Sequence, residues 1–435
     1  MSRVERIGNG MRLRAALCAA LAFGLATAAP SARAEDAPAG ASGVWEALVQ
    51  GKPVLNVRGR IEIAEANGLA RSEAYTLRTR LGYGTKPFHG FRAFAEFENV
   101  ATPSANSYFD GTRLPNTAGL TTIADPAGTE VNQGFLEFAR ADWLGLKLVG
   151  GRQRIVFDDS RFVGDVIWRQ NQQTYDGAYA ETSAGVQGLT ARYGYIGNTN
   201  RIFGGGGNSA AAADFGGNSH VLNASYTRFA PLQLVGFAYL LDLTLPAAAN
   251  PSANSSKSFG ARATGTLALG ESWKLLYQGS YAWQSQYAGK APAYSAHYAL
   301  GDLGVAWSPA GTLGAGFELL GSDAGRQVFQ TPLSTAHKFN GWADVFLDNG
   351  GPNGLRDFYG YLQPKLPWAL ALQLVYHRFW ADQGGAVLGN EFDAQLTRSF
   401  GAHLHLLFKA AYFVAADGSP RPTTYRTDFD VMVSF

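Results

Sequence analysis

The chain has 435 residues, of which 16% are charged and 13% are aromatic, and it contains 53 glycines. Its mean hydropathy of −0.09 excludes a helical membrane protein, because polar residues dilute the apolar ones along the whole chain. The formal net charge of +2 would become −2 without residues 1–34, which hold five arginines and a single acidic residue, Glu5. A balance this close to neutral excludes a strongly basic nucleic-acid-binding protein, and we expect no nucleic-acid partner.

The first 34 residues have the features of a secretory signal peptide. Arginines are concentrated before residue 15, Ala15–Ala29 is apolar but too short to span a bilayer, and residues 32–34 offer a small-x-small cleavage site. A buried Ala-rich helix is the alternative interpretation. The only cysteine, Cys18, lies in this segment, so the cleaved chain would have no disulfide. Export without cysteines is compatible with a bacterial periplasm or outer membrane.

The segment VLNVRGRIEIAE, residues 54–65, alternates strictly between apolar and polar side chains. Leu55, Val57 and Ile61 share one face, whereas the arginines and glutamates take the other. On a helix, at 100° per residue, these charges would scatter, but at 180° per residue they segregate completely, which indicates a β-strand. The pattern recurs in EAYTLRTRLGY, GFRAFAEFEN, WKLLYQGSYAWQ, WALALQLVYHRF and AHLHLLFKAAYF, where aromatic residues mark the ends of the apolar stripe.

Turns of two size classes separate these segments. Short turns such as 86–89 alternate with long segments rich in Gly, Asn, Asp, Ser and Pro, such as 100–129 and 322–355. A transmembrane β-barrel of the outer membrane has this arrangement, with short periplasmic turns and long extracellular loops. We predict an all-β, antiparallel barrel of about eighteen strands, with sixteen as the alternative, in which the last strand pairs with the first. The expected organisation is a cleaved signal peptide (1–34), a short periplasmic segment (35–53) and the barrel (54–435).

A soluble β-sandwich would show the same two-residue period. In a sandwich the apolar face would pack a core, and Trp and Tyr would have no reason to bracket it. The predicted signal peptide, the alternation of loop lengths and the terminal Phe435 favour the barrel, in contact with outer-membrane lipid.

The segment GLKLVGGRQRIVF contains one irregularity. Unbroken alternation would place Arg152 and Arg154 on the lipid-facing side with Leu148, at a cost of roughly 2–4 kcal/mol each near the bilayer midplane. We therefore expect a β-bulge at Gly150-Gly151 that turns both arginines to the lumen.

The inward positions predict a charged lumen. The cations expected to line the pore or bind anions are Arg58, Arg60, Arg78, Arg80, Arg92, Arg152, Arg154, Arg169, Arg192, Arg262 and Lys274. Their expected acidic partners are Glu62, Glu96, Glu98, Glu318, Asp393, Asp428 and Asp430. Such a lining offers a path for anions, since arginine presents paired donors to carboxylates without losing its charge. Purely structural ion pairs are the alternative; we expect adjacent Arg and Glu residues to pair, so that the unpaired arginines set the selectivity.

Catalytic and cofactor motifs are sparse. His403 and His405 share a strand face, but no carboxylate or third histidine adjoins them, so we predict lumen residues and no metal site. No G-x-S-x-G motif is present, and the glycine-rich run Phe203–Asn208 lacks the context of a phosphate-binding loop. No cofactor is expected, and an outer-membrane barrel enzyme or an adhesin without channel activity is the alternative function.

Several blocks resemble the alginate-export-type outer-membrane porins. They are TLRTRLGYGTKPFHGFRAFAEFENV, ADPAGTEVNQGFLEF, GRQRIVFDDSRFVGDVIWRQNQQTYDGAYAE, HKFNGWADVFLDNGGPNGLRDFYGYL and YHRFWADQGG, and they span nearly the whole chain after residue 34. The resemblance implies an eighteen-stranded barrel with a positively lined pore that passes polyuronate or other anionic solutes passively. Arg169 lies in the stretch WRQNQQ, which we expect to fold inward as a constricting loop.

The chain ends on the alternating segment TYRTDFDVMVSF. We expect this last strand to close the barrel against residues 54–65. A terminal Phe435 after alternating apolar residues also resembles the signal by which the outer-membrane assembly machinery recognises its clients, which makes that machinery an expected partner.

Overall fold

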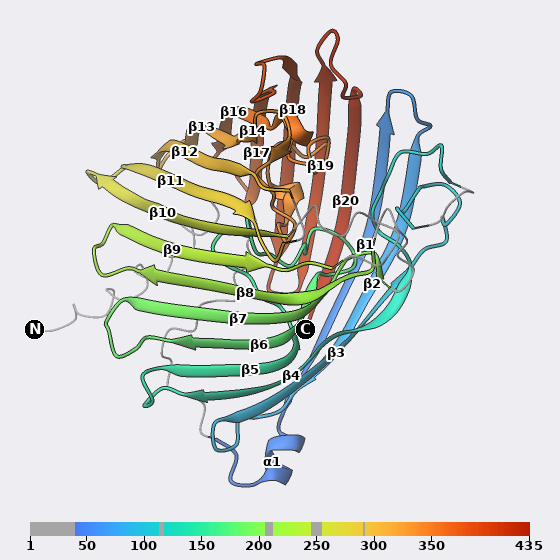
Figure 1. Ribbon diagram of the computed structural model, residues 1–435. Helices are drawn as coiled ribbons and strands as arrows, with labels where there is room; N and C mark the ends of the chain where they lie inside the picture. The colour runs from blue at the N-terminus through green and yellow to red at the C-terminus, as the bar shows by residue number, and fades with distance from the viewer. Residues whose placement is uncertain (1–39, 113–116, 205–211, 245–254, 290–291) are drawn as a thin grey trace, which may run out of the picture. The chain divides into compact units, whose positions relative to one another are not determined.

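The computed structural model describes residues 40–112, 117–204, 212–244, 255–289 and 292–435, so the predicted signal peptide lies outside the described residues. The described chain forms one eighteen-stranded antiparallel sheet, shown in Figure 1. Strand β1 pairs on one side with β2 and on the other with the last strand, β20, so the sheet closes into a barrel. The predicted fold class and the predicted closing seam are confirmed.

The barrel strands follow the predicted segments closely. They are β1 Lys52–Ala66, β2 Ser72–Gly84, β3 Phe91–Ala101, β4 Gly128–Arg140, β5 Leu146–Gln153, β6 Thr174–Thr182, β7 Leu189–Asn200, β8 Asp214–Tyr226, β9 Leu232–Leu241, β10 Ser256–Leu269, β11 Trp273–Gln286, β12 Ser295–Trp307, β13 Gly311–Leu320, β16 Leu355–Pro364, β17 Leu370–Trp380, β18 Val387–Phe400, β19 Leu404–Ala415 and β20 Thr424–Ser434. A separate small hairpin consists of β14 Ser322–Asp323 and β15 Gln327–Val328. Short 3₁₀ turns cover Ala336–Lys338 and Gly351–Asn353.

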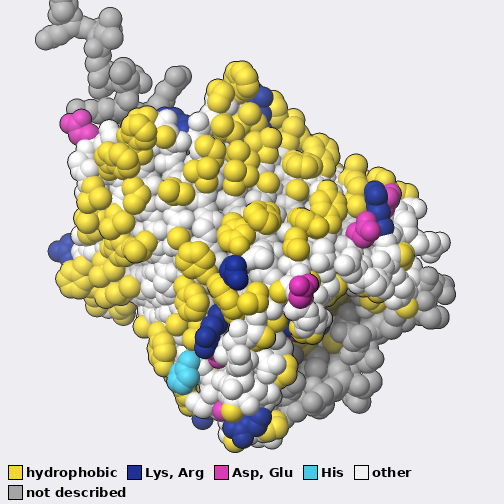
Figure 2. All heavy atoms as spheres, turned by 90° about the horizontal axis from the view of Figure 1, so that it is seen from above, with side chains coloured by type: hydrophobic (Ala, Val, Ile, Leu, Met, Phe, Trp, Pro, Cys, Tyr) yellow, Lys and Arg dark blue, Asp and Glu magenta, His cyan; other side chains and the backbone are white. Residues whose placement is uncertain are grey.

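The alternation along each strand sorts side chains between the two sides of the wall. Leu81, Leu303, Leu313 and Phe408 are among the outward side chains, and about half or more of each is exposed. Figure 2 shows hydrophobic side chains spread over the visible wall, with few charged side chains between them. Buried charged side chains occupy many inward positions, especially on β1, β2 and β20, so apolar side chains face outward and charged ones inward on this part of the wall, as in a barrel that faces lipid.

The predicted bulge at Gly150-Gly151 is absent. The ladders of β5 with β4 and β6 run without a register shift, so Arg152 stays on the outward side with Leu148, and the prediction that it turns inward is wrong. The charge is tolerated there because Asp176 lies directly opposite on β6 and accepts from Arg152 Nε at 2.7 Å and from Nη2 at 2.9 Å. Both residues lie near the strand ends that adjoin a long loop, away from the middle of the wall.

Helix α1, Val44–Val49, precedes β1 and lies at the end of the barrel that carries the short turns (Figure 1). Within the described part of the chain, no helix combines the length and the apolar character that a bilayer crossing requires.

Candidate functional site

Two segments leave the long-loop end of the wall and meet inside the barrel. Residues 154–173, between β5 and β6, are called here the first inward segment, and residues 329–346, between β15 and β16, the second. Val163 and Leu333 form a parallel bridge between them, and Gly164 N donates to Leu333 O at 2.8 Å. Together with inward side chains of strands between β6 and β19, the two segments build a buried apolar cluster that includes Phe329 and Phe346.

The two inward segments contact each other through a stacked pair of rings, and two cations of the wall lie against that pair. Trp168 stacks on His337 with a centroid distance of 4.1 Å. Arg60 Cζ lies 4.2 Å and Lys409 Nζ 3.8 Å from the centroid of the Trp168 ring. Lys409 also lies 3.0 Å from His337 Nε2, and an ammonium can only donate, so the proton of the neutral imidazole is on Nδ1, 2.7 Å from Asp344 Oδ1.

The environment of His337 favours its neutral form. Burial lowers the pKa of His337 to about 3, and the neighbouring Lys409 and Arg169 act in the same direction against Asp344. Burial alone would raise the pKa of Asp344, but His337 and Arg169 outweigh it and hold that pKa well below its usual range. At neutral pH the junction therefore contains an uncharged His337 and an ionised Asp344.

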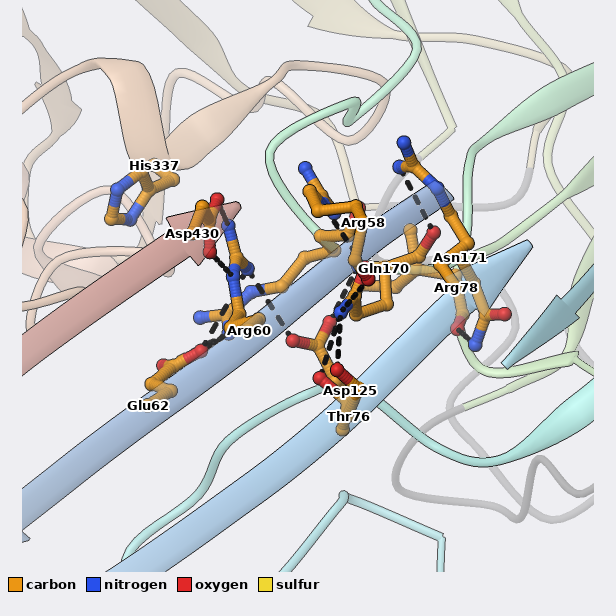
Figure 3. A network of polar contacts seen from close by, with 12 residues as sticks. Arg58, Arg60, Glu62, Thr76, Arg78, Asp125, Gln170, Asn171, His337 and Asp430 are labelled. Atoms are coloured by element: carbon orange, nitrogen blue, oxygen red, sulfur yellow. Dashed lines mark hydrogen bonds and ion pairs between the residues drawn. The ribbon is translucent and has the colours of Figure 1, made fainter. Parts of the chain in front are cut away.

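One side of the interior carries two arginines opposite each other. Arg58 on β1 pairs in register with Arg78 on β2, and both side chains are buried. Arg58 donates to Gln170 Oε1 at 2.8 Å, to Ile167 O at 3.2 Å and to the carbonyl of Arg169, so it holds the first inward segment by neutral groups (Figure 3).

Arg78 is also held by neutral groups. It donates to Asn56 Oδ1 at 2.5 Å and to Gln170 O at 3.5 Å, and its Nε is buried without a partner. Among the described residues, neither Arg58 nor Arg78 has a carboxylate partner, so both are candidates for the unpaired surplus.

Most of the other predicted cations are paired. Arg60 donates to Asp430 at 2.7 Å, Arg80 pairs with Glu98, and Arg169 bridges Glu62 at 3.0 Å and Asp344 at 2.6 Å. The remaining pairs are Arg92–Glu137, Arg154–Asp165, Arg192–Glu181 and Arg262–Asp159. Lys274 lies on an inward position of β11 but is exposed near the short-turn end. Structural ion pairs thus use most of the predicted basic lining.

Carboxylates of the wall bind the inward segments and other polar groups. Trp342 N donates to Asp393 Oδ2 at 3.2 Å, and Ala343 N donates to Glu391 Oε1 at 2.6 Å, so backbone amides of the second inward segment bind carboxylates of β18. Glu318 on β13 accepts from Arg161 of the first inward segment at 2.7 Å. Glu96 accepts from Asn132, and Asp428 lies on β20 beside Asp430.

Sequence reasoning did not single out Trp168, Gln170, His337, Asp344 or Arg161. The polar stretch around Arg169 was the one available signal, and the structure places that residue on the first inward segment. His403 and His405 make hydrogen bonds to neighbouring strands. His403 Nδ1 lies 2.6 Å from Ser434 O, and His405 Nδ1 lies 3.0 Å from Ser399 Oγ. Within the described ranges, no cluster of three or more His, Cys, Asp or Glu side chains could hold a metal ion.

No family model matches the chain, and no curated protein matches it. Solved structures do match. OccAB2 of Acinetobacter baumannii has a TM-score of 0.66 at 13% identity, and the match covers 88% of this chain and 98% of that one. OpdL of Pseudomonas aeruginosa has a TM-score of 0.63 at 13% identity, with the same two coverages. OpdK of Pseudomonas aeruginosa, solved with vanillate, has a TM-score of 0.64 at 16% identity over 88% of this chain and 98% of that one. The chain shares the fold of these proteins.

Proposed function

We propose that this protein is an outer-membrane channel that passes anionic solutes passively and performs no enzymatic reaction. The structures that share its fold are outer-membrane porins of the Occ and Opd type, which supports the membrane location and the channel activity. The observation that carries the anion preference is the cross-strand pair Arg58–Arg78, two buried positive charges without a carboxylate partner among the described residues. A passing carboxylate would supply the acceptor that this pair lacks.

Other donors near the pair also lack acceptors. Arg78 Nε and Arg80 Nη2 are buried donors without a partner. A buried charged donor that lacks an acceptor costs free energy, because it has lost its bonds to water. The carbonyls of Ile167 and Arg169 that bind Arg58 belong to a loop, so a stronger charged acceptor can compete with them. Arg58 and Arg78 are therefore the pore-lining cations that we propose for anion binding.

We favour small organic anions over a polymer as the solutes of this channel. The first inward segment bonds to β1 through Arg58 and to β10 through the pair Asp159–Arg262, and these strands lie across the barrel from each other, so a solute must pass it closely. Vanillate, the molecule bound in the OpdK structure, is an aromatic carboxylate of small size. Transport of alginate or another polyuronate, which the sequence resemblance implies, remains the second candidate because an acidic sugar chain carries the same carboxylate.

A planar-bilayer measurement with purified protein tests the proposal. Under a potassium chloride gradient, the reversal potential should indicate anion preference. Changing Arg58 and Arg78 together to Gln should lower the anion-to-cation permeability ratio several-fold, whereas the Lys pair should retain most of it because the charge stays. Matched controls are Arg71→Gln and Arg326→Gln, whose side chains are 52% and 72% exposed.

Two outcomes would contradict the proposal. Absence of conductance would favour the enzyme or adhesin alternative, and a cation preference in the wild-type channel would remove the role of the arginine pair. Addition of vanillate or polyuronate to either side then separates the substrates, because only a solute that enters the constriction should interrupt the current. Assembly of the barrel through Phe435 is part of the same proposal and is tested by deleting that residue and measuring insertion into the outer membrane.

A further inference from the structure

Helix α1 exposes an apolar face that the barrel does not cover. Val44, Trp45, Leu48 and Val49 are 61%, 76%, 47% and 55% exposed. At 100° per residue these four side chains fall within a single arc of about 140° on the helix. The remaining residues, Glu46 and Ala47, occupy the opposite side, so the helix is amphipathic with its apolar face outward.

The other side of α1 is fixed to the rim of the barrel. Lys86, in the turn between β2 and β3, donates from Nζ to Glu46 Oε1 at 2.8 Å and from its backbone N to Ala47 O at 2.9 Å. The hydroxyl of Tyr83 donates to Leu48 O. These bonds involve three consecutive residues of the short helix, so they set the direction in which its apolar face points.

The surroundings of the helix identify what covers this face. Tyr83, to which the helix is bonded, is an outward residue of β2, and Phe91 begins the outward stripe of β3 at the same rim. In the next short turn, Trp143 and Leu144 are 53% and 61% exposed. The apolar face of α1 therefore continues the lipid-facing surface of the wall at the level where aromatic residues mark a membrane interface.

We propose that α1 is an interfacial anchor, which inserts Trp45, Leu48 and Val49 into the phospholipid leaflet at the short-turn end of the barrel. The inference rests on the proposed membrane location. A short helix with one apolar face and a polar face bonded to the rim can lie in the plane of the interface and bury its apolar side chains between headgroups and acyl chains. The anchor would fix the height of the β1–β3 side of the barrel in the bilayer.

Site-directed spin labelling of the purified protein tests this proposal. A nitroxide at Leu48→Cys reports on α1, one at Leu303→Cys reports on a lipid-facing wall position that is 61% exposed, and one at Glu271→Cys reports on an exposed turn at the same rim. The three variants are reconstituted in vesicles of phosphatidylethanolamine and phosphatidylglycerol. Collision with oxygen, which concentrates in lipid, is compared with collision with a water-soluble nickel chelate.

The expected result is that the label at residue 48 resembles the label at residue 303, with high oxygen and low nickel accessibility. A label that resembles the one at residue 271 would overturn the proposal, because the face would then be in water. Protection from both reagents would also overturn it and would indicate that protein covers the helix. Conductance of the same vesicles is recorded separately, so a failure of the channel proposal is distinguishable from a failure of the anchor.

Discussion

Trp168 and His337 stack with parallel rings, 4.1 Å apart and inclined by 1°, although they belong to two loops that enter the barrel from different parts of the wall. Two cations, Arg60 of β1 and Lys409 of β19, lie over the same indole. One aromatic side chain thus links the first inward segment, the second inward segment and two wall strands. Together with the bridge between Val163 and Leu333, this junction couples the movement of the two loops.

Replacement of Trp168 by Leu should loosen this junction. A cation–π contact that is removed from water is worth about 2 kcal/mol, so its loss would change the closed-to-open ratio of the segments by about 30-fold. Trypsin should cleave the variant faster after Arg161 and Arg169, which are buried while the segments are packed. Trp168→Phe, which keeps a ring, should show a smaller effect. Equal cleavage of both variants and the wild type would show that the ring does not hold the loops.

Acid should release the inward segments. His337 in the packed state has a pKa of about 3, below its ordinary value near 6.5, so opening of the junction is coupled to proton uptake. The stabilisation is therefore complete above about pH 6.5 and declines as the pH falls toward 3. Asp344, whose pKa is held well below its usual range, loses its contribution in the same direction at lower pH.

Channel recordings between pH 7 and pH 4 should thus show growing current fluctuations on acidification. His337 faces Asp344, Lys409, Arg169 and Trp168, and a protonated imidazole would lie beside two cations while losing the bond from Lys409. The variant His337→Gln, which has no titratable group, should fluctuate equally at both ends of this range. Unchanged wild-type recordings down to pH 4 would refute the pH dependence.

The fold was accessible from the sequence because a period of two residues identifies strands directly. The start of β8 at Asp214 is not visible in the sequence, because the polar and small residues DFGGNS show no alternation. The error at Arg152 had a different cause. Its partner Asp176 can be identified only when the β5–β6 register is known, and no local pattern indicates an ion pair on the outer wall.

The interior was less accessible because its bonds join residues that are distant in sequence. Arg169 reaches Glu62, and Arg161 reaches Glu318, and no local pattern indicates such pairs. The prediction that Arg58 and Arg78 point inward is confirmed, but their role depends on which arginines the loops leave without a carboxylate. That distinction depends on the positions of the loops inside the barrel.

The contact of Gly341 with Glu391 should be sensitive to a single methyl group. Gly341 has a φ of +86°, and a Cβ there would lie 2.4 Å from Glu391 Oε2. Gly341→Ala should displace the second inward segment from β18, with faster proteolysis and more current fluctuations. Gly384→Ala is the matched control, because its φ is +82° but a Cβ would meet nothing within 4 Å. If both variants behave alike, backbone strain and not the contact with Glu391 explains the effect.

A disulfide between the inward segments should abolish their movement. Val163 and Leu333 form a bridge, whose two backbones lie about 4.8 Å apart, within the Cα separation of about 4.4–6.8 Å that disulfides span. Cys18 is the only cysteine of the chain and lies in the predicted signal peptide, so the double variant Val163→Cys/Leu333→Cys would have no competing thiol after its removal.

The oxidised double variant should conduct without the acid-induced fluctuations expected of the wild type, and a reductant should restore them. Each single cysteine variant serves as the control for the loss of the buried side chain, since both wild-type residues are fully buried. Fluctuations that persist in the oxidised channel would mean that acid acts on another part of the wall. Fluctuations that disappear only in the oxidised form would assign them to separation of the two segments, because the disulfide constrains that movement while leaving His337 free to titrate.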